Sequence, residues 1–169
     1  KTADWRLSSK RPEHTRYLWG RTRKLLLQIT LAMIHLEKIT RKNWRKATFV
    51  TTDPQRKCPL DEEWVTSAAF SIVQSVFEPE WQSRVIMDDD TIIGFVFYGM
   101  WEEKSAPLFC RYMIDIEYPG KGYGKRALPI IVDEMMREYQ TDCIYLTLEA
   151  KNERAVHLYT QFGFLATGR

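Results

Sequence analysis

Hydrophobic and polar positions follow two different periods along this chain, and each period predicts one type of element. Alternation at every second residue predicts strands at 33–39, 84–87, 91–100, 108–116 and 143–148, with another beginning at 164–166. Apolar residues three or four positions apart predict helices at 61–77, 122–139 and 152–162, and a shorter one at 43–50. The resulting order, β-α-α-β-β-β-α-β-α-β, predicts an α/β (α+β) domain with a mixed, mostly antiparallel sheet.

Composition narrows the class of protein. The chain has 169 residues, of which 44% are apolar, so it can bury the core of one domain. The three cysteines are odd in number and form no C-x-x-C pair, which favours free thiols in a reducing compartment, and we expect a cytoplasmic protein. Three scattered histidines predict no metal site. The sequence has no run of eighteen apolar residues, so no membrane span is predicted.

Basic residues concentrate at the start of the chain. Residues 1–32 carry eight lysines and arginines against two acidic residues, whereas the remainder carries 17 basic and 20 acidic side chains. We therefore expect a basic N-terminal extension at 1–32, added before a natural start at Met33, and one domain at 33–169. Basic extensions can bind nucleic acid or anionic membranes. Because these basic residues follow no recognition pattern, we expect neither partner.

A glycine-rich segment links the strand predicted at 108–116 to the helix that follows. Residues 119–126 read Pro-Gly-Lys-Gly-Tyr-Gly-Lys-Arg. Glycines let backbone N–H groups converge on one point, and the start of a helix adds partial positive charge there. The spacing fits neither the G-x-G-x-x-G fingerprint nor the G-x-x-x-x-G-K-[ST] loop. The segment predicts a site for a phosphate or pyrophosphate formed by Gly120, Lys121, Gly122, Tyr123, Gly124 and Lys125.

Two spaced motifs resemble those of the GNAT acetyltransferases, which transfer an acetyl group from acetyl-CoA to an amine. The first family motif is Gln/Arg-x-x-Gly-x-Gly/Ala; here Gly122 and Gly124 match, and Pro119 replaces Gln/Arg. The second, Asn-x-x-Ala-x-x-x-Tyr-x-x-x-Gly-Phe, is intact at Asn152, Ala155, Tyr159, Gly163 and Phe164. The resemblance covers about residues 33–168 and implies the GNAT fold, in which the fourth and fifth strands splay apart.

Four segments are similar to bacterial spermine/spermidine (diamine) acetyltransferases within that family. They are 64–77, FEPEW at 77–81, TIIGFVFYGM at 91–100 and RYMIDIEYPGKGYGKRAL at 111–128. Polyamine acetyltransferases often carry a carboxylate just before the position of Arg111, and this chain has Cys110 there. A thiol does not bind a cation as a carboxylate does. The expectation of a polyamine substrate therefore rests on the four similar segments and not on position 110.

The resemblance also implies a mechanism. The amine attacks the thioester directly, and Tyr159 gives the departing CoA thiolate a proton, although Tyr159 could instead only pack. Asn152 would hydrogen-bond the pantetheine, or could be only the N-cap of its helix. Backbone groups of the fourth strand would pair with the pantetheine at Ile114, Asp115 and Ile116. A carboxylate or a water chain would take the proton of the ammonium; Glu117 is the first candidate, and the alternatives are Asp115, Glu149, Glu78 and Glu80.

The expected function is therefore N-acetylation of a primary amine by acetyl-CoA, without a metal, with a polyamine such as spermidine or spermine as acceptor. Alternatives are an amine-bearing antibiotic, a protein amino group, or CoA binding without turnover. We expect a homodimer, because members of this family are often dimers. Only five residues follow Phe164. Unless the chain is truncated, the last strand of the sheet would come from Leu25–Leu31 or from a neighbouring subunit.

Overall fold

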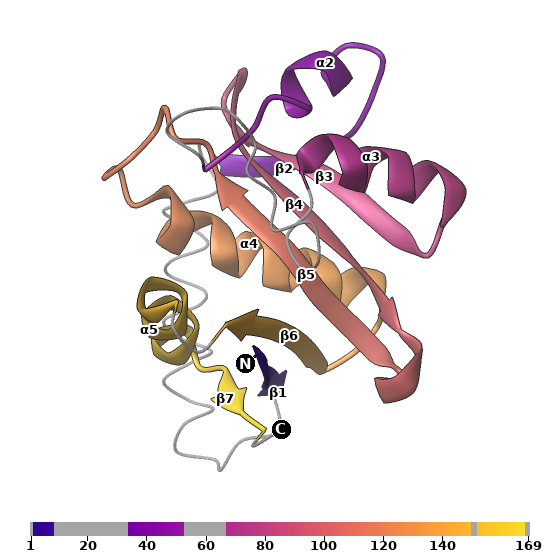
Figure 1. Cartoon of the computed structure of the whole chain (residues 1–169), viewed down its shortest axis with the longest axis vertical. Coiled ribbons are helices and arrows are strands. Elements are labelled where there is room, and N and C mark those ends of the chain that lie inside the picture. Colours follow the sequence, from indigo (N-terminus) through magenta and orange to yellow (C-terminus); the bar gives the residue numbers. More distant parts are fainter. Residues whose placement is uncertain (1, 9–33, 53–66, 150–151, 168–169) are drawn as a thin grey trace.

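A seven-stranded sheet organises the part of the chain that the computed structural model describes, residues 2–8, 34–52, 67–149 and 152–167 (Figure 1). The strands are β1 (Thr2–Ser8), β2 (Ile34–Lys38), β3 (Trp81–Asp88), β4 (Thr91–Trp101), β5 (Ala106–Ile114), β6 (Cys143–Glu149) and β7 (Leu165–Ala166). The helices are α2 (Trp44–Ala47), α3 (Ala68–Phe77), α4 (Tyr123–Glu138) and α5 (Glu153–Phe162), with a 3-10 turn, η1, at Glu102–Lys104.

The order of strands across the sheet is β2-β3-β4-β5-β6-β1-β7. Neighbouring strands are antiparallel except for β5 and β6, which run parallel because α4 crosses over between them. This confirms the prediction of a mixed, mostly antiparallel sheet flanked by helices.

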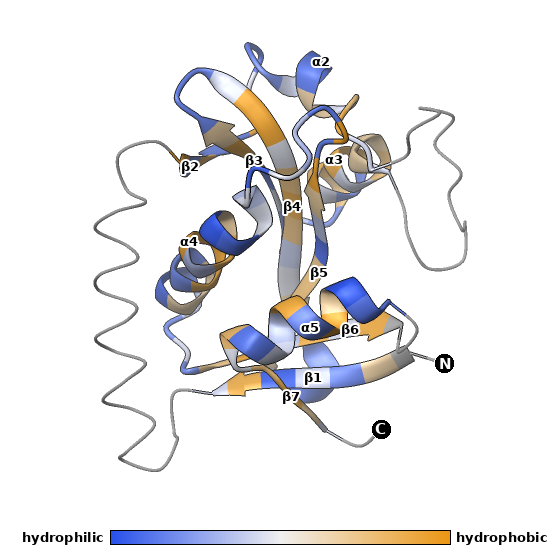
Figure 2. Ribbon diagram, turned by 90° about the vertical axis from the view of Figure 1, so that its left-hand side faces the viewer, coloured by the Kyte–Doolittle hydropathy of each residue, from blue (hydrophilic) through white to orange (hydrophobic). Residues whose placement is uncertain are grey.

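Both faces of the central strands are buried, and β4 shows the consequence in its sequence. Val96 and Tyr98 face α4 and join the large core that it covers, whereas Phe95 and Phe97 join a second cluster with Ala68 of α3. Figure 2 shows α4 and α5 striped with hydrophobic and hydrophilic residues, as expected of helices with one face on the core. The side of α4 that packs on the sheet is Ala127, Leu128, Ile131, Val132 and Met135.

A polar cluster around the buried side chains of Arg84 and Tyr98 attaches the C-terminal half of α4 to the sheet. The guanidinium of Arg84, on β3, donates to Glu134 at 3.0 Å and to Glu138 at 3.4 Å. The hydroxyl of Tyr98, on β4, lies 2.8 Å from a carboxylate oxygen of each glutamate. Burial and the two carboxylates raise the pKa of Tyr98 far above its usual value, despite the opposing effect of Arg84. Tyr98 therefore stays a hydrogen-bond donor at neutral pH.

Several element boundaries differ from the prediction. The helix predicted from 61 begins at Ala68, because the hydroxyl of Ser67 accepts a hydrogen bond from the Phe70 N–H and makes Ser67 the N-cap. Asp61, the expected cap, lies outside the described residues. Strand β3 begins at Trp81, three residues earlier than predicted. No helix in the described ranges is long and apolar enough to cross a membrane.

The first strand corrects the prediction for the N-terminal segment. Residues 2–8, assigned to an added extension, form β1 and lie inside the sheet between β6 and β7 (Figure 1). Leu7 of this strand is only 1% exposed and belongs to the main core. Part of the predicted extension is thus integral to the domain. The strand expected at Leu25–Leu31 lies outside the described residues, and β1 occupies the place beside β6.

Candidate functional site

The glycine-rich loop between β5 and α4 has the backbone that its sequence predicts. Gly120 and Gly122 have φ of +74° and +70°, in the left-handed region, and Gly122 is the N-cap of α4. The N–H groups of Lys125 and Arg126 both bond the Gly122 carbonyl at 3.1 Å. Among the described residues, the N–H groups of the first two helical residues, Tyr123 and Gly124, have no hydrogen-bond acceptor. The start of α4 therefore offers donors to an anion.

Two tyrosine hydroxyls connect the start of α4 to neighbouring strands. The hydroxyl of Tyr123 donates to Asp88 at the end of β3. The hydroxyl of Tyr112, on β5, donates to the Gly124 carbonyl at 2.8 Å. Sequence reasoning did not select Tyr112, although the alternation along 108–116 places it on the same face as Ile114. These two bonds fix the first turn of α4 relative to β3 and β5.

The parallel strands β5 and β6 separate next to the loop. They pair only at Leu108 with Tyr145 and at Phe109 with Leu146. Beyond Phe109, the edge of β5 from Cys110 to Ile114 has no strand partner on that side among the described residues. Counted from β2, strands β5 and β6 are the fourth and fifth, so this separation is the splay that the resemblance implied. A free strand edge can accept an extended molecule through its backbone groups.

Tyr159 of α5 lies where β5 and β6 separate. Its ring contacts Phe109 edge-on at 6.0 Å and Phe164 at 5.5 Å between ring centroids. Its hydroxyl makes no hydrogen bond to any described residue, and burial raises its pKa above the usual value of about 10. The nearby Tyr159 also raises the pKa of Tyr112, secondary to the effect of burial. Tyr112 thus stands between Tyr159 and the glycine-rich loop.

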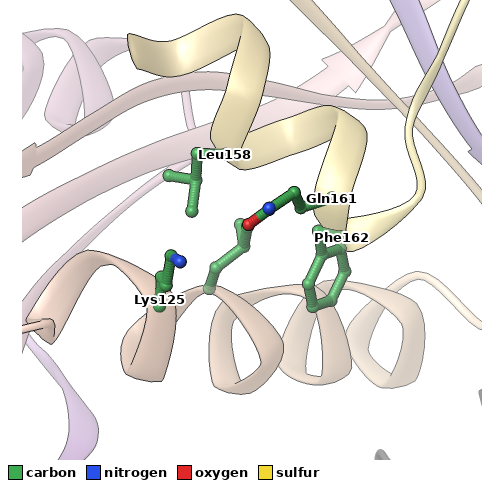
Figure 3. Close-up of a pocket in the computed structure, with 5 residues that line it drawn as sticks. Lys125, Leu158, Gln161 and Phe162 are labelled. Carbon is green, nitrogen blue, oxygen red and sulfur yellow. The ribbon is translucent and has the colours of Figure 1, made fainter.

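A groove runs between α4 and α5 (Figure 3). Lys125 and Leu128 of α4 form one wall, and Leu158, Gln161 and Phe162 of α5 form the other. Lys125 stands in the first turn of α4, one residue after Gly124, so the groove adjoins the loop. Its walls are mostly apolar, and Lys125 adds a positive charge near the free N–H groups. Such a groove suits an extended ligand that carries a phosphate at one point.

The other predicted site residues have structural partners of their own. The side chain of Asn152 accepts a bond from the Ala155 N–H at 3.1 Å, so it is the N-cap of α5. The N–H of Asp115 bonds the Ile93 carbonyl at 2.9 Å, and that of Ile116 bonds Thr51 at 2.8 Å. These two donors are therefore used inside the protein, and the free edge of β5 lies earlier, at Cys110–Ile114.

The predicted carboxylates that the structure describes lie at separate places and form no cluster at the loop. Asp115 is 8% exposed, and its carboxylate accepts from the backbone N–H groups of Thr51 and Glu117. Glu117 lies exposed in the turn before Gly120, and Glu78 and Glu80 lie exposed beside the end of α3. The side chain of Glu149 lies outside the described part of the structure. Within that part, no three His, Cys, Asp or Glu residues form a group that could hold a metal ion.

The opposite face of β5 carries a cation without an anionic partner among the described residues. Cys110 is the extra residue of a bulge, since Phe97 pairs with Arg111 and the next residue, Tyr98, pairs with Phe109. Arg111 donates to the Ser71 hydroxyl at 3.1 Å and lies 4.7 Å over the ring of Phe97, while its buried Nε has no partner. Burial lowers the pKa of Arg111 and raises that of the Cys110 thiol.

Comparison with known protein families agrees with this geometry. The model of the Acetyltransferase (GNAT) family matches residues 38–164. That range contains the glycine-rich loop, the free edge of β5 and the Asn152–Phe164 motif. The chain belongs to the GNAT acetyltransferase family.

Curated and solved relatives of this GNAT chain include polyamine acetyltransferases. The spermine/spermidine N(1)-acetyltransferase of Bacillus subtilis is 34% identical over 83 residues, which are 46% of this chain and 55% of that enzyme. The mycothiol acetyltransferase of Propionibacterium freudenreichii is 30% identical over 95 residues, 55% of this chain and 30% of that enzyme. The chain thus spans about half the length or less of these curated relatives.

The solved structures show the same fold. The spermidine N-acetyltransferase of Vibrio cholerae, in complex with CoA and spermine, superimposes with a TM-score of 0.64 at 20% identity. The superposition covers 81% of this chain and 83% of that one.

Replacing Tyr112 by phenylalanine should loosen the attachment of the glycine-rich loop to β5 without changing the chemical step. The variant loses the bond to the Gly124 carbonyl, worth about 1 kcal/mol, so the KM for acetyl-CoA should rise about fivefold while kcat stays within about twofold. Steady-state kinetics with acetyl-CoA varied would measure this. Tyr145→Phe is the matched control, because Tyr145 contacts Trp101 on the far side of β6. A fall in kcat at unchanged KM would contradict the anchoring role and would move Tyr112 into the proton transfer.

Proposed function

We propose that this protein transfers an acetyl group from acetyl-CoA to a primary amine, with a polyamine such as spermidine or spermine as the leading acceptor. One observation carries the proposal: the loop with free N–H groups, the free edge of β5 and the unbonded hydroxyl of Tyr159 adjoin one another, with Tyr112 between loop and hydroxyl. The polyamine acceptor is supported by the similarity to the Bacillus subtilis enzyme.

Each part of the site would serve a different part of acetyl-CoA. The start of α4 would hold the pyrophosphate through the N–H groups of Tyr123 and Gly124, with Lys121 and Lys125 lowering its negative charge. The free edge of β5 would pair with the pantetheine up to Ile114. Asn152 would add a side-chain N–H donor at the start of α5, since only its oxygen is used by the cap.

The reaction follows from what these groups can exchange. The neutral amine attacks the thioester carbon, the new C–N bond forms, the C–S bond breaks, and Tyr159 protonates the CoA thiolate. Before the attack, Glu117 or a water chain takes one proton from the ammonium and so generates the neutral amine. The nitrogen loses a second proton as the amide forms, and this proton restores the phenol of Tyr159. Glu117 is exposed near the end of β5, so it would exchange the ammonium proton with solvent. Replacing it by glutamine should lower kcat/KM for the amine if Glu117 is the base, because an amide cannot take the proton, whereas Glu103→Gln, on η1, should leave kcat/KM unchanged.

An acceptor with an anionic group is a second candidate, favoured by Arg111. A partly buried guanidinium without a carboxylate partner among the described residues repels a polycation and attracts a carboxylate. The test is CoA release from acetyl-CoA with spermidine, spermine, short diamines, an aminoglycoside, a lysine peptide and free amino acids. Release with the polyamines supports the leading acceptor; release only with carboxylate-bearing amines supports the second. No release despite measured acetyl-CoA binding would favour a CoA-binding module instead.

We also propose that the protein is cytoplasmic and forms a homodimer. Cys110 and Cys143, the two described cysteines, are free thiols, which suits a reducing compartment. A related polyamine acetyltransferase, that of Vibrio cholerae, has been solved as a dodecamer. Sedimentation of the purified chain would determine its own assembly.

A further inference from the structure

Asp88, the last residue of β3, is joined to the start of α4 by a bond between side chains. Its carboxylate oxygen Oδ2 accepts a hydrogen bond from the hydroxyl of Tyr123, the first residue of that helix. The two residues are 35 positions apart in the sequence, so the bond connects separate parts of the fold. The reaction proposed above gives this carboxylate no role.

The second oxygen of the Asp88 carboxylate is buried without a partner. Oδ1 makes no hydrogen bond within the part of the chain that the structure describes. A buried polar atom that lacks a partner lowers stability, and burial of a charge costs more than burial of a neutral group. A neutral oxygen could accept from the Tyr123 hydroxyl at a smaller cost. What the carboxylate adds is a stronger, charge-assisted bond to Tyr123.

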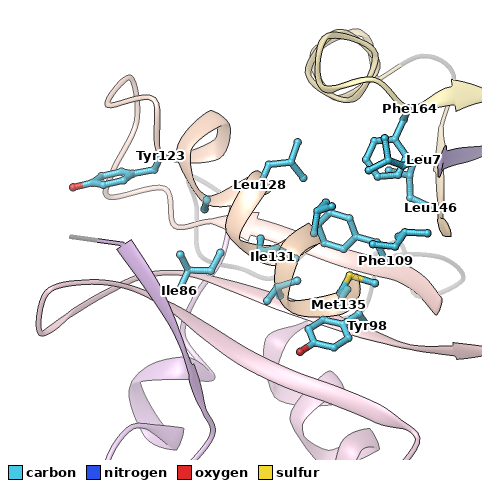
Figure 4. Packing of buried hydrophobic residues seen from close by; sticks show 14 of the residues in the cluster. Leu7, Ile86, Tyr98, Phe109, Tyr123, Leu128, Ile131, Met135, Leu146 and Phe164 are labelled. Atoms are coloured by element: carbon cyan, nitrogen blue, oxygen red, sulfur yellow. The ribbon is translucent and has the colours of Figure 1, made fainter. Parts of the chain in front are cut away.

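The ring of Tyr123 is held by its neighbours as well. It is 7% exposed and belongs to the main core, with Tyr118 edge-on at 6.2 Å between ring centroids and the guanidinium of Arg126 5.3 Å from its centroid. Figure 4 shows Tyr123 at the margin of the core, with its hydroxyl directed away from the other labelled residues. The bond to Asp88, together with burial, raises the pKa of Tyr123, so the phenol stays a donor at neutral pH.

The placement of this side chain fixes the backbone that would hold the phosphate. Tyr123 and Gly124 carry the two N–H groups of α4 without an acceptor among the described residues. Tyr112 on β5 holds Gly124 by its carbonyl, and Asp88 on β3 holds Tyr123 by its hydroxyl. β3 lies between β2 and β4, so it is a firm support. Donors that are already ordered bind an anion more tightly than donors that binding must first order.

We propose that Asp88 is a positioning residue for the phosphate of acetyl-CoA. Acting through the Tyr123 hydroxyl, its carboxylate holds the free N–H groups at the start of α4 in the arrangement that binds the anion. This role rests on the proposed function, because it requires acetyl-CoA as the ligand. It also has a sign that a purely electrostatic effect lacks. A carboxylate repels a phosphate, so loss of its charge alone would tighten binding, whereas loss of positioning weakens it.

Calorimetric titration of the full chain with acetyl-CoA distinguishes these two signs. The variants are Asp88→Ala, Asp88→Asn, Tyr123→Phe and the double variant of Asp88→Ala with Tyr123→Phe. Asparagine keeps a neutral acceptor for the phenol, and phenylalanine keeps the ring with its contacts. Asp90→Asn is the matched control, because Asp90 is exposed in the same acidic turn and takes no part in the bond to Tyr123.

The Kd for acetyl-CoA should rise about tenfold in Asp88→Ala and in Tyr123→Phe, and about threefold in Asp88→Asn, which keeps a weaker bond. The double variant should bind no more weakly than either single variant, because both substitutions break the same bond. The Asp90→Asn control should bind as the parent chain does or slightly more tightly.

Unchanged or tighter binding in Asp88→Ala would overturn the proposal and leave the bond a contact that only stabilises the fold. Additive losses in the double variant would overturn it too, since the two residues would then act separately. If Asp88→Ala does not fold, Tyr123→Phe and Asp88→Asn decide by the same sign. Absence of acetyl-CoA binding in the parent chain is a different failure, because it would reject the proposed function and the role of Asp88 with it.

Discussion

A Gly122→Val variant should lose measurable affinity for acetyl-CoA while remaining folded. Gly122 has φ of +70° as the N-cap of α4, a conformation that a β-branched residue adopts only at a cost of about 1–3 kcal/mol. A Cβ at this position meets no protein atom within 4 Å. The valine side chain would therefore occupy open space beside the free N–H groups, where a phosphate would lie. Calorimetric titration should show affinity reduced by about a hundredfold or more, since the charge-assisted bonds to the amides are lost.

A second variant separates strain from steric blocking. Asparagine tolerates the left-handed region, so Gly122→Asn should melt close to the parent protein, while valine should lower the melting temperature by several degrees, about 2–4 °C per kcal/mol. If a side chain blocks the phosphate, both variants lose affinity for acetyl-CoA. If only valine loses it, strain in the loop is the cause. Normal affinity in the valine variant would show that the loop does not hold the phosphate.

Elements with strong local signals were predictable from the sequence. The helix at 122–139 was expected because five apolar residues repeat at helical spacing, and Gly122 marks its start. In the same way, Gly163 marks the end of α5. The hairpin of β3 and β4 was expected because both strands alternate around an acidic turn, although burial on both faces hides much of that alternation. The glycine-rich loop was recognisable because its residue types and its place before a helix are local features.

Features that depend on distant residues were not predictable. Strand β1 lacks a neighbour in sequence, and its pairing with β6 joins positions about 140 residues apart. The donors of Asp115 and Ile116 were expected to face the cofactor, but Ile93 and Thr51 accept them through tertiary contacts. Tyr112 looked like an ordinary aromatic residue of a strand, and its role depends on where the first turn of α4 lies. Such contacts leave no local pattern in the sequence.

The Tyr159→Phe variant should lower kcat by tens of times or more and change the KM for acetyl-CoA by less than about twofold. Phenylalanine keeps the ring contacts with Phe109 and Phe164 and removes only the hydroxyl. That hydroxyl lies where β5 and β6 separate and makes no hydrogen bond within the described residues. Without it the CoA thiolate would leave unprotonated, and loss of a general acid typically costs about 10²–10⁴ in rate.

The raised pKa of Tyr159 has a definite consequence for the pH profile. The folded protein holds the phenol proton above pH 10, so no alkaline loss of kcat between pH 6 and 9.5 should come from this residue. The same apolar surroundings raise the pKa of the thiolate's conjugate acid, which keeps proton transfer from the phenol feasible. Tyr139→Phe is the matched control, because Tyr139 is also a part-buried tyrosine with a raised pKa, about 12, but packs on Tyr98. Equal turnover in the Tyr159→Phe variant and the parent would leave Tyr159 a packing residue between α5 and β5, with protonation of the thiolate left to water.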